Sequence, residues 1–189
     1  MKVLALLIAL SLLAACREEA AAPEPVKMIR EATGHFCQMN LHEHAGPKAQ
    51  VHLDGLPGAP LFFSQVRDAI AYQRMPEQSH AITAIYVQDM GAAESWEDPG
   101  EGHWIPAERA HFVLGSRRVG GMGAPETVPF SDAGAARAFA RENGGEVLRL
   151  AQVPDAAVLA PVATPTPEAG DEAADFANRL RRLSEQREN

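Results

Sequence analysis

Residues 63–72 (FSQVRDAIAY) and residues 130–139 (FSDAGAARAF) decide the fold. Both segments begin with Phe-Ser and continue as alanine-containing, helix-forming sequence. Each therefore predicts a helix, with Ser64 and Ser131 capping the first turns. A Met-Pro pair ends the first helix and a Gly-Gly pair ends the second. The similarity of the two segments indicates a weak internal repeat, for which chance similarity between two alanine-rich helices is the alternative.

Strand-like runs flank both helices in the same order, two before the helix and one after it. They are residues 49–53, 61–63 and 82–87 around the first helix, and residues 110–114, 127–130 and 147–151 around the second. This pattern predicts an α+β protein of two related ββαβ half-units in one compact region, with the halves at about 28–90 and 108–162. Residues 88–107 are rich in Gly, Pro and acidic residues and predict a connecting loop.

The N-terminus carries the pattern of a bacterial lipoprotein signal. Lys2 precedes an apolar stretch, residues 3–12, that is too short to cross a bilayer as a helix, which needs about 20 residues. The Leu-Ala-Ala-Cys that follows resembles a lipobox, so we expect residues 1–15 to be removed and Cys16 to carry a lipid. An ordinary secretory signal with a chance cysteine is the alternative. Arg17, where an Asp would favour the inner membrane, favours the outer membrane and its periplasmic face.

Both flanks of the predicted domain, which spans residues 28–162, have the composition of linkers. Residues 16–27 are rich in Glu, Ala and Pro and predict a tether, and residues 163–189 predict a linker with a charged tail. The formal net charge of −8 argues against nucleic acid as a partner, because neutralising phosphates requires clustered Lys and Arg.

Cysteine usage gives the sharpest functional signal. If Cys16 carries the lipid, Cys37 is the single free thiol of a chain in an oxidising compartment. Cys37 and Met39 stand two residues apart, so on an extended segment both side chains emerge on one face. A thiolate and a thioether form a soft donor pair that suits Cu(I). Zinc is the rival ion, since nearby histidines also supply donors, and a buried Cys37 without a ligand is a further alternative.

Met122 is a candidate third ligand. It lies within the glycine-rich residues 120–125, where its neighbours lack the side chains to pack around it as a core methionine. If the two halves bring this loop to Cys37, Met122 adds another soft donor.

Five segments in a fixed order carry a family resemblance. They are residues 34–39 (GHFCQM), 44–50 (HAGPKAQ), 62–64 (FFS), 121–123 (GMG) and 129–130 (PF). This pattern, with the lipobox, resembles the NosL lipoproteins, the accessory proteins of nitrous oxide reductase, over about residues 33–162. The resemblance implies a fold of two ββαβ halves and Cu(I) binding by Cys37 and Met39, and Met122 matches a Met-Gly position of the family.

The resemblance also implies a function that is not enzymatic. It implies copper delivery in the periplasm toward the multicopper sulfide centre of nitrous oxide reductase, with the reductase apoprotein and an ABC-type membrane assembly complex as partners. A thiol-based redox enzyme using Cys37 is an alternative, although such catalysts usually need a resolving cysteine. A blue-copper electron carrier would need a separated upstream histidine. In a lipoprotein with interaction surfaces alone, replacing Cys37 by serine would be silent.

Overall fold

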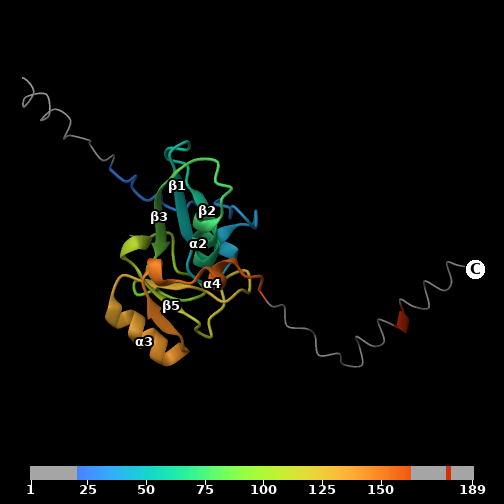
Figure 1. Cartoon of the computed structure of the whole chain (residues 1–189), viewed down its shortest axis with the longest axis vertical. Coiled ribbons are helices and arrows are strands. Elements are labelled where there is room, and N and C mark those ends of the chain that lie inside the picture. Colours follow the sequence, from blue (N-terminus) through green and yellow to red (C-terminus); the bar gives the residue numbers. More distant parts are fainter. Residues whose placement is uncertain (1–20, 163–177, 180–189) are drawn as a thin grey trace, which may run out of the picture. The chain divides into compact units, whose positions relative to one another are not determined.

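The computed structural model describes residues 21–162 and 178–179, so the predicted signal, Cys16 and nearly all of the predicted tail lie outside the described residues. Two antiparallel sheets form the fold, with strand orders β2-β1-β3-β4 and β6-β5-β7 (Figure 1). The strands are β1 (Ala49–Leu53), β2 (Leu61–Phe63), β3 (Ile82–Gln88), β4 (Trp104–Pro106), β5 (His111–Leu114), β6 (Val128–Phe130) and β7 (Glu146–Leu148).

Helices follow the second strand of each sheet in the chain. They are α2 (Val66–Arg74) and α3 (Ala133–Asn143), with a short α4 (Asp155–Leu159) near the end of the compact unit and 3-10 turns at Leu41–Glu43, Ala107–Arg109 and Leu150–Gln152. The order strand-strand-helix-strand therefore occurs twice, and the predicted mixed α+β class is confirmed. Among the described residues, none of the helices combines the length and apolar character that a membrane crossing requires.

The predicted loop between the halves contains a strand. Trp104–Pro106 pairs antiparallel with Tyr86–Gln88 and adds β4 to the edge of the first sheet. The prediction of loop for all of residues 88–107 is therefore wrong. Three residues that include a proline have no strand periodicity of their own, and their conformation depends on a partner that only the tertiary fold supplies.

Both helices begin one residue later than predicted. The N-cap residues are Gln65 and Asp132, not Ser64 and Ser131, and the Asp132 carboxylate accepts a hydrogen bond from Ala135 N–H at 2.7 Å. Ser131 instead donates its N–H to the Asp89 carboxylate at 3.0 Å. Both helices end where the sequence predicted, at Met75 before a proline and at Gly144, whose φ is 78°.

β1 is buried on both of its faces. Ala49, Val51 and Leu53 face the core that α2 covers. On the opposite face, the Gln50 side chain exchanges two hydrogen bonds with the backbone of Val26, at 2.8 and 3.0 Å. The last residues of the predicted tether therefore lie against the first sheet.

β5 connects the two cores. Phe112 packs into the core under the first sheet, whereas its neighbour Val113 packs with Val128, Phe130 and Ala136 beneath α3. Because successive strand residues point to opposite faces, β5 holds the halves together. The loops at the ends of these strands are thereby fixed on a common frame.

Candidate metal centre

The segment that carries Cys37 and Met39 is a tight turn. Thr33 and Asn40 form an isolated antiparallel bridge at its base, and the chain reverses at Gln38, whose φ of 56° lies in the left-handed region. The segment is therefore a turn, and the condition of an extended backbone, under which the sequence placed both side chains on one face, does not hold. Residue spacing alone does not reveal a left-handed non-glycine residue, because such a residue is held by tertiary contacts.

Gly34 opens the space that the thiol occupies. A Cβ atom placed on Gly34 would lie 2.4 Å from Cys37 Sγ, 3.5 Å from Leu41 Cδ2 and 3.7 Å from Ser64 N. The sulfur atom thus lies against the Gly34 backbone, and Gly34 N–H donates to Met39 C=O at 3.0 Å to close the turn. Cys37 is a half-buried free thiol, and Met39 is 45% exposed.

We expect Gly34→Ala to weaken Cu(I) binding roughly tenfold or more, the range seen when ligand orientation is disturbed. The new methyl group and Cys37 Sγ cannot occupy the same space, so the thiol must turn away although no donor atom is lost. Competition titration with a chromophoric Cu(I) chelator measures the change. Gly102→Ala is the matched control, because a Cβ at Gly102 meets no atom within 4 Å. Equal affinities for the two variants would contradict the expectation.

Aromatic contacts attach the Cys37 turn to β2 and α2. His35 N–H donates to Phe62 C=O at 2.6 Å, and the Phe36 ring packs edge-on against Phe63 with centroids 5.1 Å apart. The His35 ring lies 5.6 Å from the Tyr72 ring. Phe36 nevertheless remains 46% exposed beside the thiol.

The glycine-rich segment around Met122 forms a closed surface loop. Val119 and Pro125 form an isolated bridge at its base, and Met122 N–H donates to Gln65 Oε1 at 2.9 Å. The Met122 side chain is 46% exposed, which agrees with the prediction that its neighbours would not bury it.

Both loops are attached to one short connection between β2 and α2. The Cys37 turn contacts Phe62 and Ser64, and the Met122 loop bonds to Gln65. These contact residues lie within four consecutive positions, residues 62–65. Two loops from opposite halves of the chain are therefore attached to the same short stretch.

The histidines near Cys37 make separate contacts. His42 Nε2 lies 3.1 Å from the Ile29 carbonyl, and His52 Nε2 lies 2.9 Å from Gln50 Oε1. Across residues 21–162, no three side chains among His, Cys, Asp and Glu are placed to hold a metal ion together.

His44 is a functional candidate to which the sequence assigned no role. Its Nδ1 lies 3.1 Å from the carbonyl of Gly121, the residue before Met122, and its buried Nε2 has no hydrogen-bond partner. A carbonyl only accepts, so Nδ1 donates this bond, and Nε2 is the ring nitrogen left without a hydrogen-bond partner. Metal-binding histidines are commonly oriented in this way. The signals in the sequence were the nearness of His44 to Cys37 and its place at the start of the family segment 44–50.

A buried pair of ionisable residues, Lys48 and Glu126, lies beneath the Met122 loop, and no sequence pattern predicted it. Glu126 Oε1 accepts N–H bonds from Arg67 at 3.1 Å and Thr127 at 2.8 Å, while burial raises the pKa of this carboxyl to about 8. Burial likewise lowers the pKa of Lys48 to about 8. Lys48 Nζ donates to His44 C=O at 2.7 Å, which links the pair to the loop of the candidate site.

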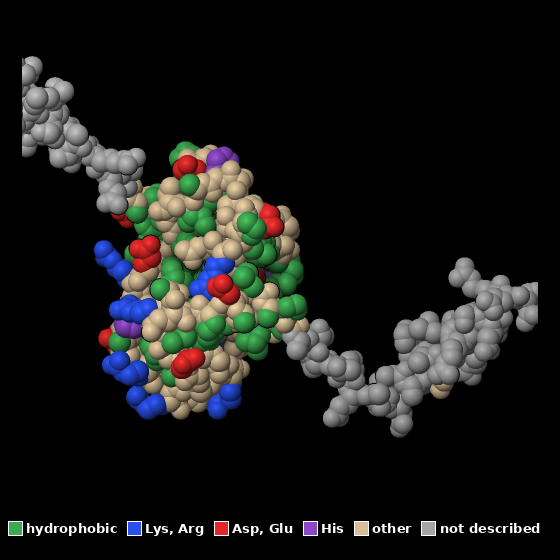
Figure 2. Space-filling model, in the orientation of Figure 1, with side chains coloured by type: hydrophobic (Ala, Val, Ile, Leu, Met, Phe, Trp, Pro, Cys, Tyr) green, Lys and Arg blue, Asp and Glu red, His purple; other side chains and the backbone are tan. Residues whose placement is uncertain are grey.

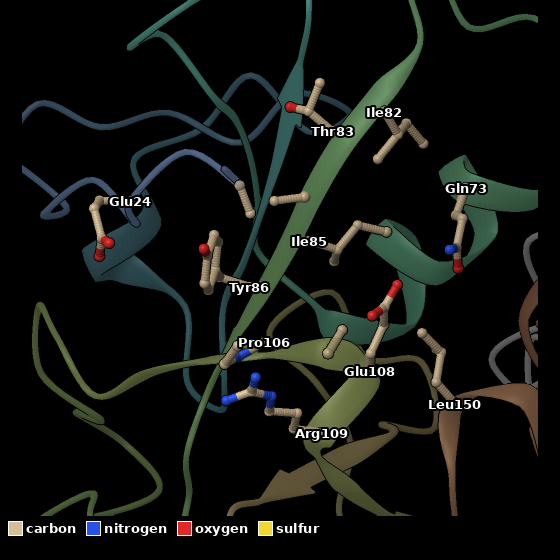
Figure 3. Close-up of a pocket in the computed structure, with 13 residues that line it drawn as sticks. Glu24, Gln73, Ile82, Thr83, Ile85, Tyr86, Pro106, Glu108, Arg109 and Leu150 are labelled. Carbon is tan, nitrogen blue, oxygen red and sulfur yellow. The ribbon is translucent and has the colours of Figure 1, made fainter. Parts of the chain in front are cut away.

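A groove of about 430 Å³ lies elsewhere, along β3. Figure 3 shows Glu24 and Tyr86 on one side of this strand and Gln73 and Leu150 on the other. Its lining contains no Cys, Met or His. The groove therefore lacks the soft donors of the candidate metal centre.

The fold and the site together define a class: a small α+β protein that presents, within residues 21–162, a free thiol and exposed thioethers on surface turns, the donor chemistry of soft-metal binding proteins.

The chain belongs to the NosL family, whose model matches residues 25–158. The copper-binding lipoprotein NosL of Achromobacter cycloclastes is 58% identical over 178 residues, covering 93% of this chain and 91% of that protein. The copper-binding lipoprotein NosL of Stutzerimonas stutzeri is 33% identical over 134 residues, covering 70% and 67%. The crystal structure of the copper chaperone NosL from Shewanella denitrificans has a TM-score of 0.65 and 29% identity, covering 70% of this chain and 97% of that chain.

Proposed function

We infer that this chain is a copper-binding lipoprotein that carries Cu(I) and delivers it for assembly of the multicopper sulfide centre of nitrous oxide reductase. Family membership supports copper binding, since both curated relatives are copper-binding lipoproteins. The observation that carries the proposal at the level of residues is the half-buried free thiol of Cys37, against Gly34 and in one turn with Met39.

In the proposed site, Cys37, Met39 and Met122 are the copper ligands. Two thioethers and a thiolate are soft donors that stabilise Cu(I). The attachment of the two loops to one β2–α2 connection supports a shared site. The buried His44 Nε2, which has no hydrogen-bond partner, supports His44 as a nitrogen donor for the same ion. Because Met39 and Met122 are nearly half exposed, an acceptor can approach the ligands before the carrier releases copper.

The cellular setting follows from the N-terminal sequence and the family. A lipid on Cys16 anchors the protein to a bacterial membrane, facing the periplasm, and Arg17 favours the outer membrane. The proposed partners are the apoprotein of nitrous oxide reductase and an ABC-type membrane assembly complex, with no role for nucleic acid. The repeated ββαβ order further supports two related half-units.

An enzymatic role for Cys37 has less support. The chain contains two cysteines, and the lipid would occupy Cys16, so no resolving thiol remains for a thiol–disulfide cycle. The relatives carry names of binding and chaperone proteins. We therefore propose a carrier and not an enzyme.

The ligand set is tested with three methionine variants of the mature chain from Arg17, titrated anaerobically with Cu(I) against a chromophoric chelator. We expect Met39→Leu and Met122→Leu each to raise the dissociation constant for Cu(I) about tenfold, a change of about 1.4 kcal/mol. Leucine keeps the volume but lacks the sulfur lone pairs. Met75→Leu is the matched control, since Met75 is 40% exposed but lies at the end of α2. If Met122→Leu binds as tightly as this control, Met122 is not a ligand.

A further inference from the structure

The two loops of the candidate site lie in non-acidic parts of an acidic chain. The whole chain has 25 Asp and Glu residues against 17 Lys and Arg, yet residues 32–42 and 109–125 contain no Asp or Glu. The second of these segments also contains Arg109, Arg117 and Arg118. The two segments that carry the sulfur donors are therefore themselves neutral to positive.

Arg117 and Arg118 are exposed and held beside the Met122 loop. The Arg118 guanidinium lies over the Trp96 ring, 5.2 Å from its centroid, and Arg117 Nη2 donates to Glu142 C=O at 2.8 Å. Within residues 21–162, neither arginine forms an ion pair with a carboxylate. Their charges are thus fixed in position and available to a partner. Figure 2 also shows Lys and Arg side chains at the end of the molecule that holds α3 and β5.

Exposed apolar side chains occupy the same two loops. Phe36, Met39, Val119 and Met122 are 46%, 45%, 52% and 46% exposed. Exposed apolar groups gathered within a polar rim are typical of protein interaction sites. Here two of the apolar groups, Met39 and Met122, are proposed ligands and the other two lie in the same loops, with the arginines next to the Met122 loop.

Two exposed carboxyl residues lie beside these arginines: Glu142, whose carbonyl accepts from Arg117, and Glu97, which follows Trp96. Within residues 21–162, neither carboxylate forms an ion pair with Arg117 or Arg118. Glu31 and Glu43 lie beyond the two ends of the Cys37 segment, and Asp68 is partly buried, with its carboxylate bonded to Gln65 at 3.2 Å. Glu126 lies beneath the Met122 loop, where burial raises its pKa to about 8, so it is largely uncharged at neutral pH.

We propose, on the basis of the carrier function inferred above, that this surface docks a copper acceptor protein whose own metal donors are surrounded by carboxylates. The arginines attract and orient the acidic rim, and complementary charge accelerates such encounters more than it tightens them. The apolar centre then excludes water while the soft ligands of donor and acceptor exchange the ion. An acceptor of this kind is favoured over a basic one, which the arginines repel.

Two chelators with the same phenanthroline nitrogen donors but different charge serve as probes: anionic bathocuproine disulfonate and neutral neocuproine. Cu(I) is loaded onto the mature chain from Arg17, which retains every described residue, and its removal is followed by stopped-flow absorbance. Raising NaCl from about 20 to about 300 mM is expected to slow removal by the anionic chelator roughly tenfold, because salt screens the attraction. Arg117→Gln with Arg118→Gln should slow it several-fold at low salt. The rate of copper removal by neocuproine should change neither with salt nor in the double variant.

Arg137→Gln with Arg141→Gln is the matched control, since both of these arginines are exposed on α3. Equal salt dependence for the two chelators, or equal slowing by the two double variants, would overturn the docking proposal while the copper affinity stands. The salt series on the unaltered protein needs no variant to fold. A chain that fails to hold Cu(I) at equilibrium would overturn the carrier function itself. Binding of phosphatidylglycerol vesicles through Arg117 and Arg118, with no charge effect on copper removal, would assign the surface to the membrane instead.

Discussion

We expect the Cys37→Ser variant to bind Cu(I) roughly a hundredfold more weakly, or worse. This loss of affinity exceeds the loss of about 10- to 100-fold that follows when a residue hydrogen-bonded to a metal ligand is replaced. Serine replaces the soft thiolate by a hard hydroxyl of similar size, so the space against Gly34 stays filled. The hydrogen bond from Gly34 to Met39 does not involve this side chain, and the turn should persist. Anaerobic competition titration of the mature chain from Arg17 gives the affinity.

Thermal unfolding followed by circular dichroism is the control for Cys37→Ser. The variant should unfold within a few degrees of the parent, because the side chain is half-buried and is not part of the main hydrophobic cores. Parallel titration with Zn²⁺ separates the two metals, and tighter binding of zinc than of Cu(I) by the parent would favour the zinc alternative. Unchanged Cu(I) affinity in a folded Cys37→Ser variant would mean that Cys37 is not a copper ligand. It would favour the alternative of a lipoprotein with interaction surfaces alone.

The sequence predicted the strands and helices correctly where local sequence signals agree with the tertiary structure. The runs at residues 49–53 and 61–63 match β1 and β2 residue for residue, because alternation and flanking turn residues coincide there. The helix caps at Ser64 and Ser131 were misplaced by one residue. Serine is a good cap in isolation, but in the fold Ser131 is engaged by Asp89, and Asp132 caps α3. β4 depends wholly on pairing with Tyr86–Gln88 and had no signal of its own.

The sequence indicated which residues form the candidate site but not how they are arranged in space. The residue types alone indicated the site. Cys37 is a lone thiol, Met39 stands two residues from it, and Met122 lies among residues too small to bury it. The left-handed Gln38 and the shared attachment of both loops to the β2–α2 connection depend on long-range contacts. The same holds for the free Nε2 of His44, which exists because the Gly121 carbonyl fixes the other ring nitrogen.

We expect Glu126→Gln to remove most of the loss of stability that the parent shows as pH rises above neutrality. Burial raises the pKa of Glu126 from 4.5 to about 8, so the folded state holds a proton that the unfolded chain releases. Stability is therefore complete below pH 4.5 and falls as pH rises toward 8, by about 1 kcal/mol per pH unit. Glutamine retains an oxygen for the N–H groups of Arg67 and Thr127 and carries no titratable proton. Urea unfolding at pH 6.5 and 7.5 measures the slope.

In the interval from pH 6.5 to 7.5, Glu126 has the largest effect among the buried groups. Burial lowers the pKa of His52 from 6.5, so its loss of stability with decreasing pH lies mainly below the interval and opposes the Glu126 slope near the lower edge. The pKa of Lys48 is lowered from 10.5 to about 8, so stability rises between pH 8 and 10.5 and its contribution is nearly constant below. Glu146→Gln, at an exposed position on β7, should keep the parental slope. An equal slope in Glu126→Gln would mean that Glu126 is ionised in the folded protein, and the Met122 loop would then rest on a buried Lys48–Glu126 charge pair.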